Sequence, residues 1–112
     1  MRYWFLVFSN PVAGREAAYN HWYDNRHLQD LLRVPGIVSA RRFKVSDVQL
    51  NPGDEPPGSY LALYEIEADS PEKAFAEIRA RTGTEAMPLS DAIDLQSVTT
   101  MTFSAHTPIS RG

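Results

Sequence analysis

Two apolar stretches, Arg2-Tyr-Trp-Phe-Leu-Val-Phe8 and Tyr60-Leu-Ala-Leu-Tyr-Glu-Ile66, decide how this chain folds. Both are short and rich in aromatic and aliphatic residues, which is typical of β-strands. Successive side chains of a strand point to opposite faces of the sheet, and both stretches carry large apolar residues at odd and at even positions. The two predicted strands are therefore hydrophobic on both faces.

Two helices and two further strands are predicted around these stretches. The segment from Gly14 to Arg33 has no proline or internal glycine and is followed by Pro35-Gly36, which predicts a long helix. A strand is expected from Ile37 to Val45. Ser70-Pro71-Glu72 is a helix-start signal, and Gly83 ends that second helix. Residues 93–104 form a Thr-rich last strand, and residues 46–59 and 83–92 are long loops.

The element order βαββαβ predicts a ferredoxin-like α+β fold, with a four-stranded antiparallel sheet and two helices on one face. We expect residues 1–112 to form a single domain. The first and third strands occupy the middle of such a sheet, in agreement with their apolar composition. The predicted edge strands carry polar residues, as edges usually do: Arg41, Arg42, Lys44, Asp94 and Gln96.

The second face of the sheet needs a cover that the two helices do not provide. In the first strand, Tyr3, Phe5 and Val7 point one way and Trp4, Leu6 and Phe8 the other; in the third strand, Leu61 and Leu63 oppose Tyr60, Ala62, Tyr64 and Ile66. Burial of a large apolar side chain contributes about 1.5–3 kcal/mol, so several such residues in water would be costly. We therefore expect a homodimer that forms through this sheet face. The alternative is a monomer with a partly exposed aromatic face.

Composition excludes several classes of protein. The chain has 14 acidic and 11 basic residues, a net charge of −3, which argues against a nucleic-acid partner. Cysteine is absent, so there is no disulfide, thiolate zinc site or Cys nucleophile. The longest apolar run, Tyr3 to Phe8, is too short for a membrane span or a signal peptide. We expect a cytoplasmic protein with no membrane partner.

The first predicted helix carries the candidate site. Projection at about 100° per residue places four residues on one apolar stripe: Ala17, Ala18, Leu28 and Leu32. His21 falls in the middle of that stripe and is expected to point at the sheet. Asp24 lies at its margin, three residues from both His21 and His27, within reach of either imidazole. Tyr23 and His27, four residues apart, form a neighbouring ridge outside the stripe.

A histidine beside a carboxylate is a common arrangement for a base near neutral pH. The candidate catalytic residues are His21 or His27 as the base and Asp24 as the residue that orients it, with Tyr23 or Tyr64 as a phenolic donor. The alternatives are a core histidine bonded to the backbone or to an asparagine, and a surface pair of Asp24 with His27.

No cofactor or metal is expected. His21 and His27 are six residues apart, unlike the i, i+4 pair of a helical zinc site. The chain has neither a glycine-rich phosphate loop nor a G-x-S-x-G elbow, so nucleotide and acyl-enzyme chemistry are poor hypotheses. Haem bound through one histidine stays open, although no motif supports it.

One combination of motifs resembles a known family. Trp22-Tyr23-Asp24-Asn25-Arg26-His27-Leu28 is followed by Val34-Pro35-Gly36-Ile37 and Arg41-Arg42-Phe43. This helical Trp-x4-His motif before a Pro-Gly turn and an arginine-aromatic strand is similar to the EthD-like branch of the dimeric α/β-barrel (ferredoxin-like) superfamily. The similarity covers residues 3–45 well, and the element order extends it over nearly the whole chain.

The resemblance implies a homodimer of ferredoxin-like protomers, in a superfamily that includes cyclases, isomerases and cofactor-free monooxygenases. It assigns Trp22 and His27 to the family's helical motif and Arg42 to its strand arginine. One of Arg41 and Arg42 is expected to reach solvent or a helix carboxylate. The other is expected to hold an anionic ligand or to pair with a buried acid.

We expect a small aromatic-lined cleft between helices and sheet. The predicted lining consists of Tyr3 or Trp4 together with Trp22, Tyr23, Arg42, Tyr64 and Phe103. The leading hypothesis is a cofactor-independent acid–base enzyme on an aromatic or polyketide-like small molecule. The alternative is a non-catalytic ligand-binding or structural homodimer, because a shared fold does not define a reaction.

Overall fold

The computed structural model describes all residues 1–112 and has four strands and three α-helices, joined by two short helices of other types. In chain order the elements are β1 (Arg2–Ser9), α1 (Glu16–Trp22), the π-helix η1 (Tyr23–His27), α2 (Leu28–Leu32), β2 (Ile37–Lys44), β3 (Tyr60–Glu67), α3 (Glu72–Arg81), the 3₁₀-helix η2 (Leu95–Ser97) and β4 (Thr99–Ser104). α1, η1 and α2 follow one another without a break and together form the predicted first helix.

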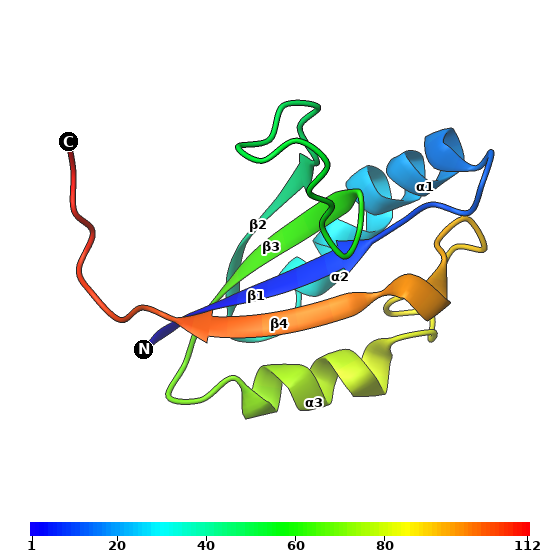
Figure 1. The fold of residues 1–112 in the computed structure, drawn as a ribbon. Helices are drawn as coiled ribbons and strands as arrows, with labels where there is room; N and C mark the ends of the chain where they lie inside the picture. The colour runs from blue at the N-terminus through cyan, green and yellow to red at the C-terminus, as the bar shows by residue number, and fades with distance from the viewer.

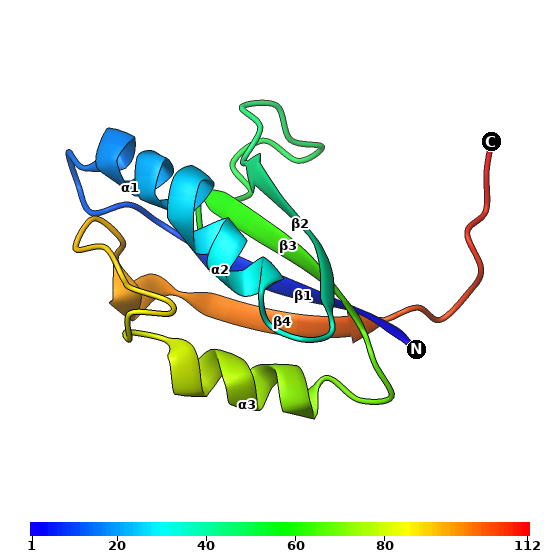
Figure 2. The same cartoon turned by 180° about the vertical axis from the view of Figure 1, so that it is seen from behind.

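The sheet has the strand order β2-β3-β1-β4, and all neighbouring strands are antiparallel. β1 and β3 are central, as their apolar sequences predict. The first helix and α3 both lie on one face of the sheet, which is plain from the two opposite views in Figures 1 and 2. This arrangement confirms the predicted ferredoxin-like α+β fold.

The start of α3 follows the predicted signal. The Ser70 hydroxyl accepts a hydrogen bond from the backbone N–H of Glu72 at 3.3 Å, which satisfies one of the free N–H groups at the helix start. Ala74 is buried against the sheet, and Phe75 and Ile78 pack beside it. The chain leaves the helix at Gly83, whose φ of +84° lies in a region that favours glycine.

The first helix packs on the sheet with a different face from the predicted one. Its buried residues, with those just after it, are Tyr19, Tyr23, Asp30, Leu31 and Val34. Ala17 and His21 are exposed. Tyrosine rings bury far more apolar area than alanine methyl groups, and the Tyr19 hydroxyl shares a hydrogen bond with Ser9 inside the core. The predicted stripe was wrong because it counted the tyrosines as polar.

The last strand is shorter than predicted. β4 begins at Thr99, and residues 95–97 form a 3₁₀ turn. Before this turn, Ile93 pairs with Pro11 in an isolated bridge. Asp94 and Gln96 therefore do not lie on an edge strand. The Asp94 carboxylate instead accepts a hydrogen bond from the Gln96 backbone N–H at 3.1 Å, an Asx turn that bends the chain.

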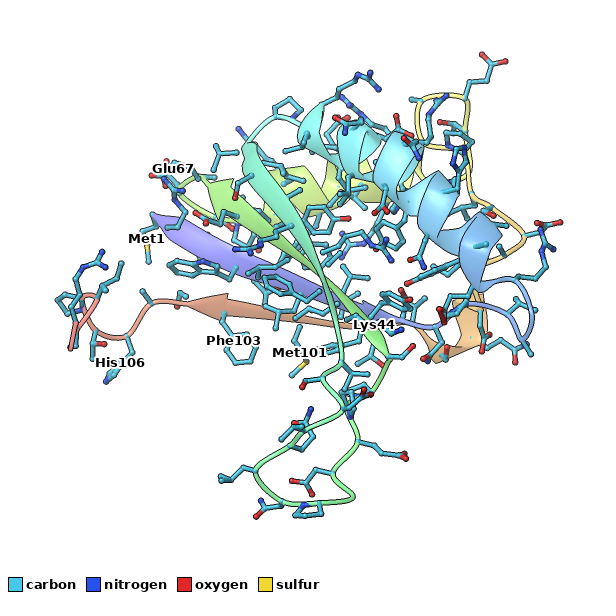
Figure 3. The ribbon with its side chains drawn as sticks, turned by 90° about the horizontal axis from the view of Figure 1, so that it is seen from above. Met1, Lys44, Glu67, Met101, Phe103 and His106 are labelled. Carbon is cyan, nitrogen blue, oxygen red and sulfur yellow. The ribbon has the colours of Figure 1, made fainter.

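The two faces of the sheet differ in what covers them. The helix face holds most of the buried core, including Tyr60, Ala62, Tyr64 and Ile66 of β3. We call the opposite face the open face; its apolar residues are Trp4, Leu6, Phe8, Phe43, Leu61, Leu63, Met101 and Phe103, and Arg41 and Glu65 lie on it as well. Met101 and Phe103 are 53% and 55% exposed, and Figure 3 shows both pointing away from the helices. Neither the first helix nor α3 covers this face.

Candidate active site

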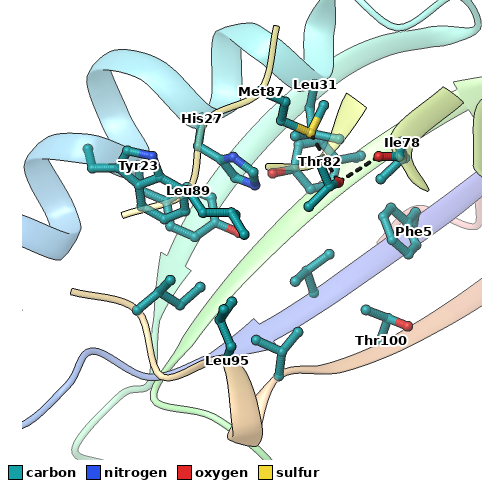
Figure 4. Close-up of a pocket in the computed structure, with 15 residues that line it drawn as sticks. Phe5, Tyr23, His27, Leu31, Ile78, Thr82, Met87, Leu89, Leu95 and Thr100 are labelled. Atoms are coloured by element: carbon teal, nitrogen blue, oxygen red, sulfur yellow. Dashed lines mark hydrogen bonds between the residues drawn. The ribbon is translucent and has the colours of Figure 1, made fainter. Parts of the chain in front are cut away.

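A cavity of about 180 Å³ lies between the helices and the sheet. Figure 4 shows the side chains that surround it. Its lining is almost entirely apolar and consists of Phe5, Val7, Trp22, Tyr23, His27, Leu31, Tyr64, Ile78, Thr82, Met87, Leu89, Ile93, Leu95, Val98 and Thr100. An apolar pocket with a few converging polar groups is the usual form of a small-molecule site. In this cavity the polar groups include an imidazole, two phenols and the hydroxyls of Thr82 and Thr100.

The π-helix η1 brings the imidazole into the cavity. Its end is marked by a hydrogen bond from the Leu28 backbone N–H to the Tyr23 carbonyl, an i→i+5 bond where an α-helix would have i→i+4. His27, predicted to lie outside the sheet-facing stripe, lines the cavity together with Tyr23, because the face that packs on the sheet is the one that carries Tyr19 and Tyr23. π-helical turns are frequent at functional sites.

The His27 ring is held between two aromatic rings. It stacks on Trp22 with centroids 4.5 Å apart, and it meets Tyr23 edge-on at 5.0 Å. Its Nδ1 atom is buried and has no hydrogen-bond partner. The pKa of His27 is lowered from 6.5 to about 4, chiefly by burial and also by the positive charge of Arg42, against the opposing effect of Asp30. The ring is therefore neutral near pH 7 and able to accept a proton.

The phenols of Tyr64 and Tyr23 also belong to the polar part of the cavity. The Tyr64 hydroxyl is buried without a hydrogen-bond partner, and burial raises its pKa well above the ordinary value. Burial likewise raises the pKa of Tyr23 to about 12. Both groups therefore stay protonated and can donate a hydrogen bond to an oxygen of a bound molecule.

Arg42 lies behind Tyr23 and outside the cavity. Its guanidinium carbon is 4.3 Å from the Tyr23 ring centroid, and it also lies over the rings of Tyr19 and Tyr60. Its Nη1 donates to Asp24 at 2.7 Å and its Nη2 to Asn20 at 2.9 Å. Arg42 is thus the strand arginine that reaches a carboxylate on the helix layer. Arg42 is not among the residues that line the cavity, and its Nε is buried without a hydrogen-bond partner.

The predicted bond between Asp24 and a histidine is absent. The Asp24 carboxylate accepts from Arg42 instead. His21 lies on the solvent side of the first helix, where its Nδ1 is 3.2 Å from the side-chain nitrogen of Asn25. The predicted orientation of His21 toward the sheet was wrong because the tyrosine face, on the other side of the helix, is the one that packs.

Neither residue proposed at the start of β1 lines the cavity. The Tyr3 hydroxyl donates to the Asp69 carbonyl at 3.0 Å, and Trp4 lies on the open face, where it pairs with Phe103. Strand alternation places Phe5 and Val7 in the lining instead. Of the predicted site residues, the structure brings together Trp22, Tyr23, His27 and Tyr64.

Sequence reasoning missed the segment that covers the cavity. Residues 83–92, which we call the strap, contribute the buried Met87 and the half-exposed Leu89. Trp22 Nε1 donates to the Pro88 carbonyl at 3.0 Å, and Arg26 Nη2 donates to the Glu85 carbonyl at 2.7 Å. The signal was present in the sequence, because Met and Leu in a proline-containing loop are unusual unless the loop is packed.

No three histidine, aspartate or glutamate side chains gather in a group able to hold a metal ion. No helix has both the length and the apolar character needed to cross a bilayer.

The chain has a ferredoxin-like α+β fold. Comparison with solved structures finds proteins that are similar to it in this fold. A mutant of SnoaB, a cofactor-independent oxygenase from Streptomyces nogalater, is 17% identical with a TM-score of 0.64 and matches over 98% of both chains. An EthD family protein from Bacillus halodurans is 11% identical with a TM-score of 0.53, over 94% of this chain and 99% of that one. No family model and no curated protein sequence matches the chain.

Proposed function

We propose that this protein is a cofactor-independent acid–base enzyme that acts on a small aromatic or polyketide-like molecule. The observation that carries the proposal is a neutral imidazole and a protonated phenol, each with a buried and unpartnered polar atom, in the lining of one apolar cavity: His27 and Tyr64. A buried polar atom without a hydrogen-bond partner lowers the stability of the folded protein. A cavity lined by two such residues is therefore suited to a ligand that forms a hydrogen bond with each of them. The likeness in fold to a cofactor-independent oxygenase agrees with this function.

The proposed step is one proton transfer. His27 accepts a proton from an acidic C–H or O–H group of a bound ketone or phenol, and Tyr64 donates a hydrogen bond to the oxygen that becomes negative. Tyr23, whose phenol is also protonated, is a second donor. A water-poor apolar cavity strengthens these interactions with the developing charge. Positioned acid–base groups of this kind contribute about 10²–10⁴-fold to a rate.

The anion formed in this step can react in three ways, each of which corresponds to one of the proposed classes of enzyme. It takes back the proton at another carbon, as in an isomerase. It attacks a carbonyl carbon of the same molecule, as in a cyclase. It gives an electron to dioxygen and combines with the superoxide to form a hydroperoxide, which loses water to leave a ketone, as in a monooxygenase. All three begin with the proton transfer, so that step is the one to test.

We also propose that the open face is covered by the open face of a second copy. The support is its composition: Leu6 pairs directly with Leu63 in the middle of the face, with Met101 on the other side of Leu6. A contiguous apolar patch of this kind usually marks an interface. The cavity lies on the other face of the sheet, so each protomer would keep a complete site.

The test is hydrogen exchange into a substrate mimic in D₂O, followed by NMR. Anthrone, 2-tetralone and a panel of phenols with activated C–H positions are the probes. We expect the protein to accelerate deuterium incorporation into at least one probe and His27→Ala to lose about 10²-fold or more of this acceleration. Tyr64→Phe keeps the ring but removes the hydroxyl, and we expect an intermediate loss.

His21→Ala is the matched control, since His21 lies at the surface and outside the cavity. It should leave the exchange rate unchanged. Probes that bind without accelerated exchange would favour the non-catalytic ligand-binding alternative. An acceleration that survives His27→Ala would refute the assigned base.

A further inference from the structure

A second cavity adjoins the first. It measures about 220 Å³ and is lined by Phe5, Phe75, Ile78, Arg79, Thr100 and Thr102. Phe5, Ile78 and Thr100 also line the cavity that holds His27, so the two spaces share one wall. The second space lies between α3 and β4, and it is more polar than the first.

The side-chain pattern of β4 distinguishes this space from the open face. Thr100 pairs with Val7 and Thr102 with Phe5, so both threonines point to the helix face. Met101 and Phe103 point to the opposite face. A strand that only closed the core would carry its apolar residues toward the helices. β4 does the reverse and presents two hydroxyl groups to the second cavity.

Arg79 of α3 is a free cation at this cavity. It is exposed, and no carboxylate lies within ion-pair distance of it. Arg81, two residues further along the same helix, differs in this respect, because its Nε is 2.9 Å from a Glu77 carboxylate oxygen. Arg79 is therefore available to a ligand, and its planar guanidinium suits a carboxylate, which it can bind through two parallel hydrogen bonds.

We propose that the two cavities bind one molecule, an amphipathic carboxylic acid. Its aromatic part occupies the His27 cavity, and a chain passes Phe5 and Ile78 to place the carboxylate at Arg79, with Thr100 and Thr102 as further hydrogen-bond donors. This inference rests on the proposed function, since it takes the His27 cavity as the place of the reacting ring. Beyond the proposed function, it states that the substrate carries a negative charge and that Arg79 selects for this charge.

The test compares binding of matched acids and amides by isothermal titration calorimetry. The probes are 6-hydroxynaphthalenes that carry at position 2 an alkyl chain of increasing length, ended either by a carboxylate or by its primary amide. We expect an optimum chain length at which the wild-type protein binds the acid about tenfold more tightly than the amide, a difference of about 1.4 kcal/mol. We expect Arg79→Gln to remove this preference while amide binding stays unchanged.

Lys73→Gln is the control for net charge, because Lys73 is an exposed cation on the same helix that does not line either cavity. It should keep the acid preference, and Arg79→Lys should keep part of it. Equal affinities for acid and amide at every chain length would overturn the subsite, as would an Arg79→Gln variant that weakens both probes equally.

Binding of the amide probe distinguishes a failure of this inference from a failure of the proposed function. Amide binding that is lost in a cavity-filling Leu31→Trp variant reports on the His27 cavity alone, and the difference between acid and amide reports on Arg79 alone. A protein that binds the amide without preference for the acid would keep the proposed function and refute the subsite. A protein that binds neither probe would count against both.

Discussion

At the scale of single residues, His27 combines two properties that seldom occur together. It is largely removed from water, and yet its Nδ1 has no partner within the chain. A histidine in the core usually donates to a backbone carbonyl or a carboxylate, which fixes its tautomer. Here the ring is fixed by stacking on Trp22 and by the edge contact with Tyr23. Its polar atoms are left for a bound molecule.

Burial of His27 predicts a loss of stability in mild acid. Folding lowers the pKa of this ring from 6.5 to about 4. The unfolded chain therefore takes up a proton at a higher pH than the folded chain does. The stability contributed by the neutral ring is complete above pH 6.5 and is lost as the pH falls toward about 4, by at most about 3 kcal/mol.

Urea unfolding across this pH range measures the effect. We expect His27→Leu to reduce the fall in unfolding free energy between about pH 6.5 and pH 4. His21→Gln serves as the control and should behave as the wild type does. A His27→Leu variant with the full wild-type pH dependence would show that the ring is not desolvated.

Arg42 shows how a residue type can be identified correctly and its role misjudged. The sequence placed one arginine on each face of β2, and the structure agrees. Arg42, however, packs among tyrosine rings and pairs with Asp24, although the Nε of Arg42 has no hydrogen-bond partner. Its positive charge lowers the pKa of His27. Arg42 thus affects the site through its positive charge, and its packing among the tyrosine rings holds that charge in place.

At the scale of elements, Trp22 of the first helix contacts both the strap and the candidate base. Its ring stacks on His27, and its Nε1 donates to the Pro88 carbonyl of the strap. Met87 of the strap is fully buried. Leu89 of the strap and Leu95, which also line the cavity, are partly exposed.

We predict that Trp22→Phe loosens the strap. This change keeps an aromatic ring over His27 but removes the indole N–H, and a typical buried hydrogen bond contributes about 1 kcal/mol. Amide hydrogen exchange over residues 84–92 should become about fivefold faster, while exchange in the core of β3 stays the same. The measurement is exchange followed by mass spectrometry.

Trp4→Phe is the matched control, because Trp4 lies on the open face. It should leave exchange in the strap at the wild-type rate. Unchanged exchange in Trp22→Phe would show that the contacts of Met87 and the Arg26 bond hold the strap without the indole.

The π-helix is the element that sequence analysis had no means of finding. Nothing in Tyr23-Asp24-Asn25-Arg26-His27 distinguishes a π turn from an α turn, since both accept the same residue types. Within this turn Arg26 bonds to the Asp30 carboxylate on the same helix and to the Glu85 carbonyl of the strap. His27 was predicted outside the packed face because the tyrosine face, which packs on the sheet, was not the face chosen.

At the scale of the whole molecule, the open face predicts a stable dimer. We expect sedimentation equilibrium to give a mass of about twice the 12.6 kDa of one chain. Leu63→Glu, in the middle of the face beside Leu6, should return the mass of a single chain, because an unpaired charge in an apolar interface costs several kcal/mol.

Ala80→Glu provides the comparison, since Ala80 is exposed on α3. It introduces the same charge and should leave the dimer intact. A wild-type protein that sediments as one chain at micromolar concentration would refute the proposed interface.

The sequence by itself determined that this protein has one four-stranded sheet with helices on one face. Apolar residues on both faces of β1 and β3, breakers at Pro35-Gly36 and the cap at Ser70 are local signals. Each depends on the chemistry of residues that are near in sequence, so the strand order and the extent of α3 follow from them. Tyr23, His27 and Tyr64 were also proposed as site residues from residue type and spacing, and Trp22 from the family resemblance.

Only the tertiary structure decided which histidine lines the cavity, what Asp24 and Arg42 bind, and that the strap covers the site. These features depend on groups far apart in the sequence, such as Trp22 with Pro88 and Asp24 with Arg42. The choice between two helix faces likewise depends on total packing, because tyrosine rings bury more area than alanine and leucine side chains offer on the other face. The local pattern of apolar residues therefore gives little information on which of the two helix faces packs on the sheet.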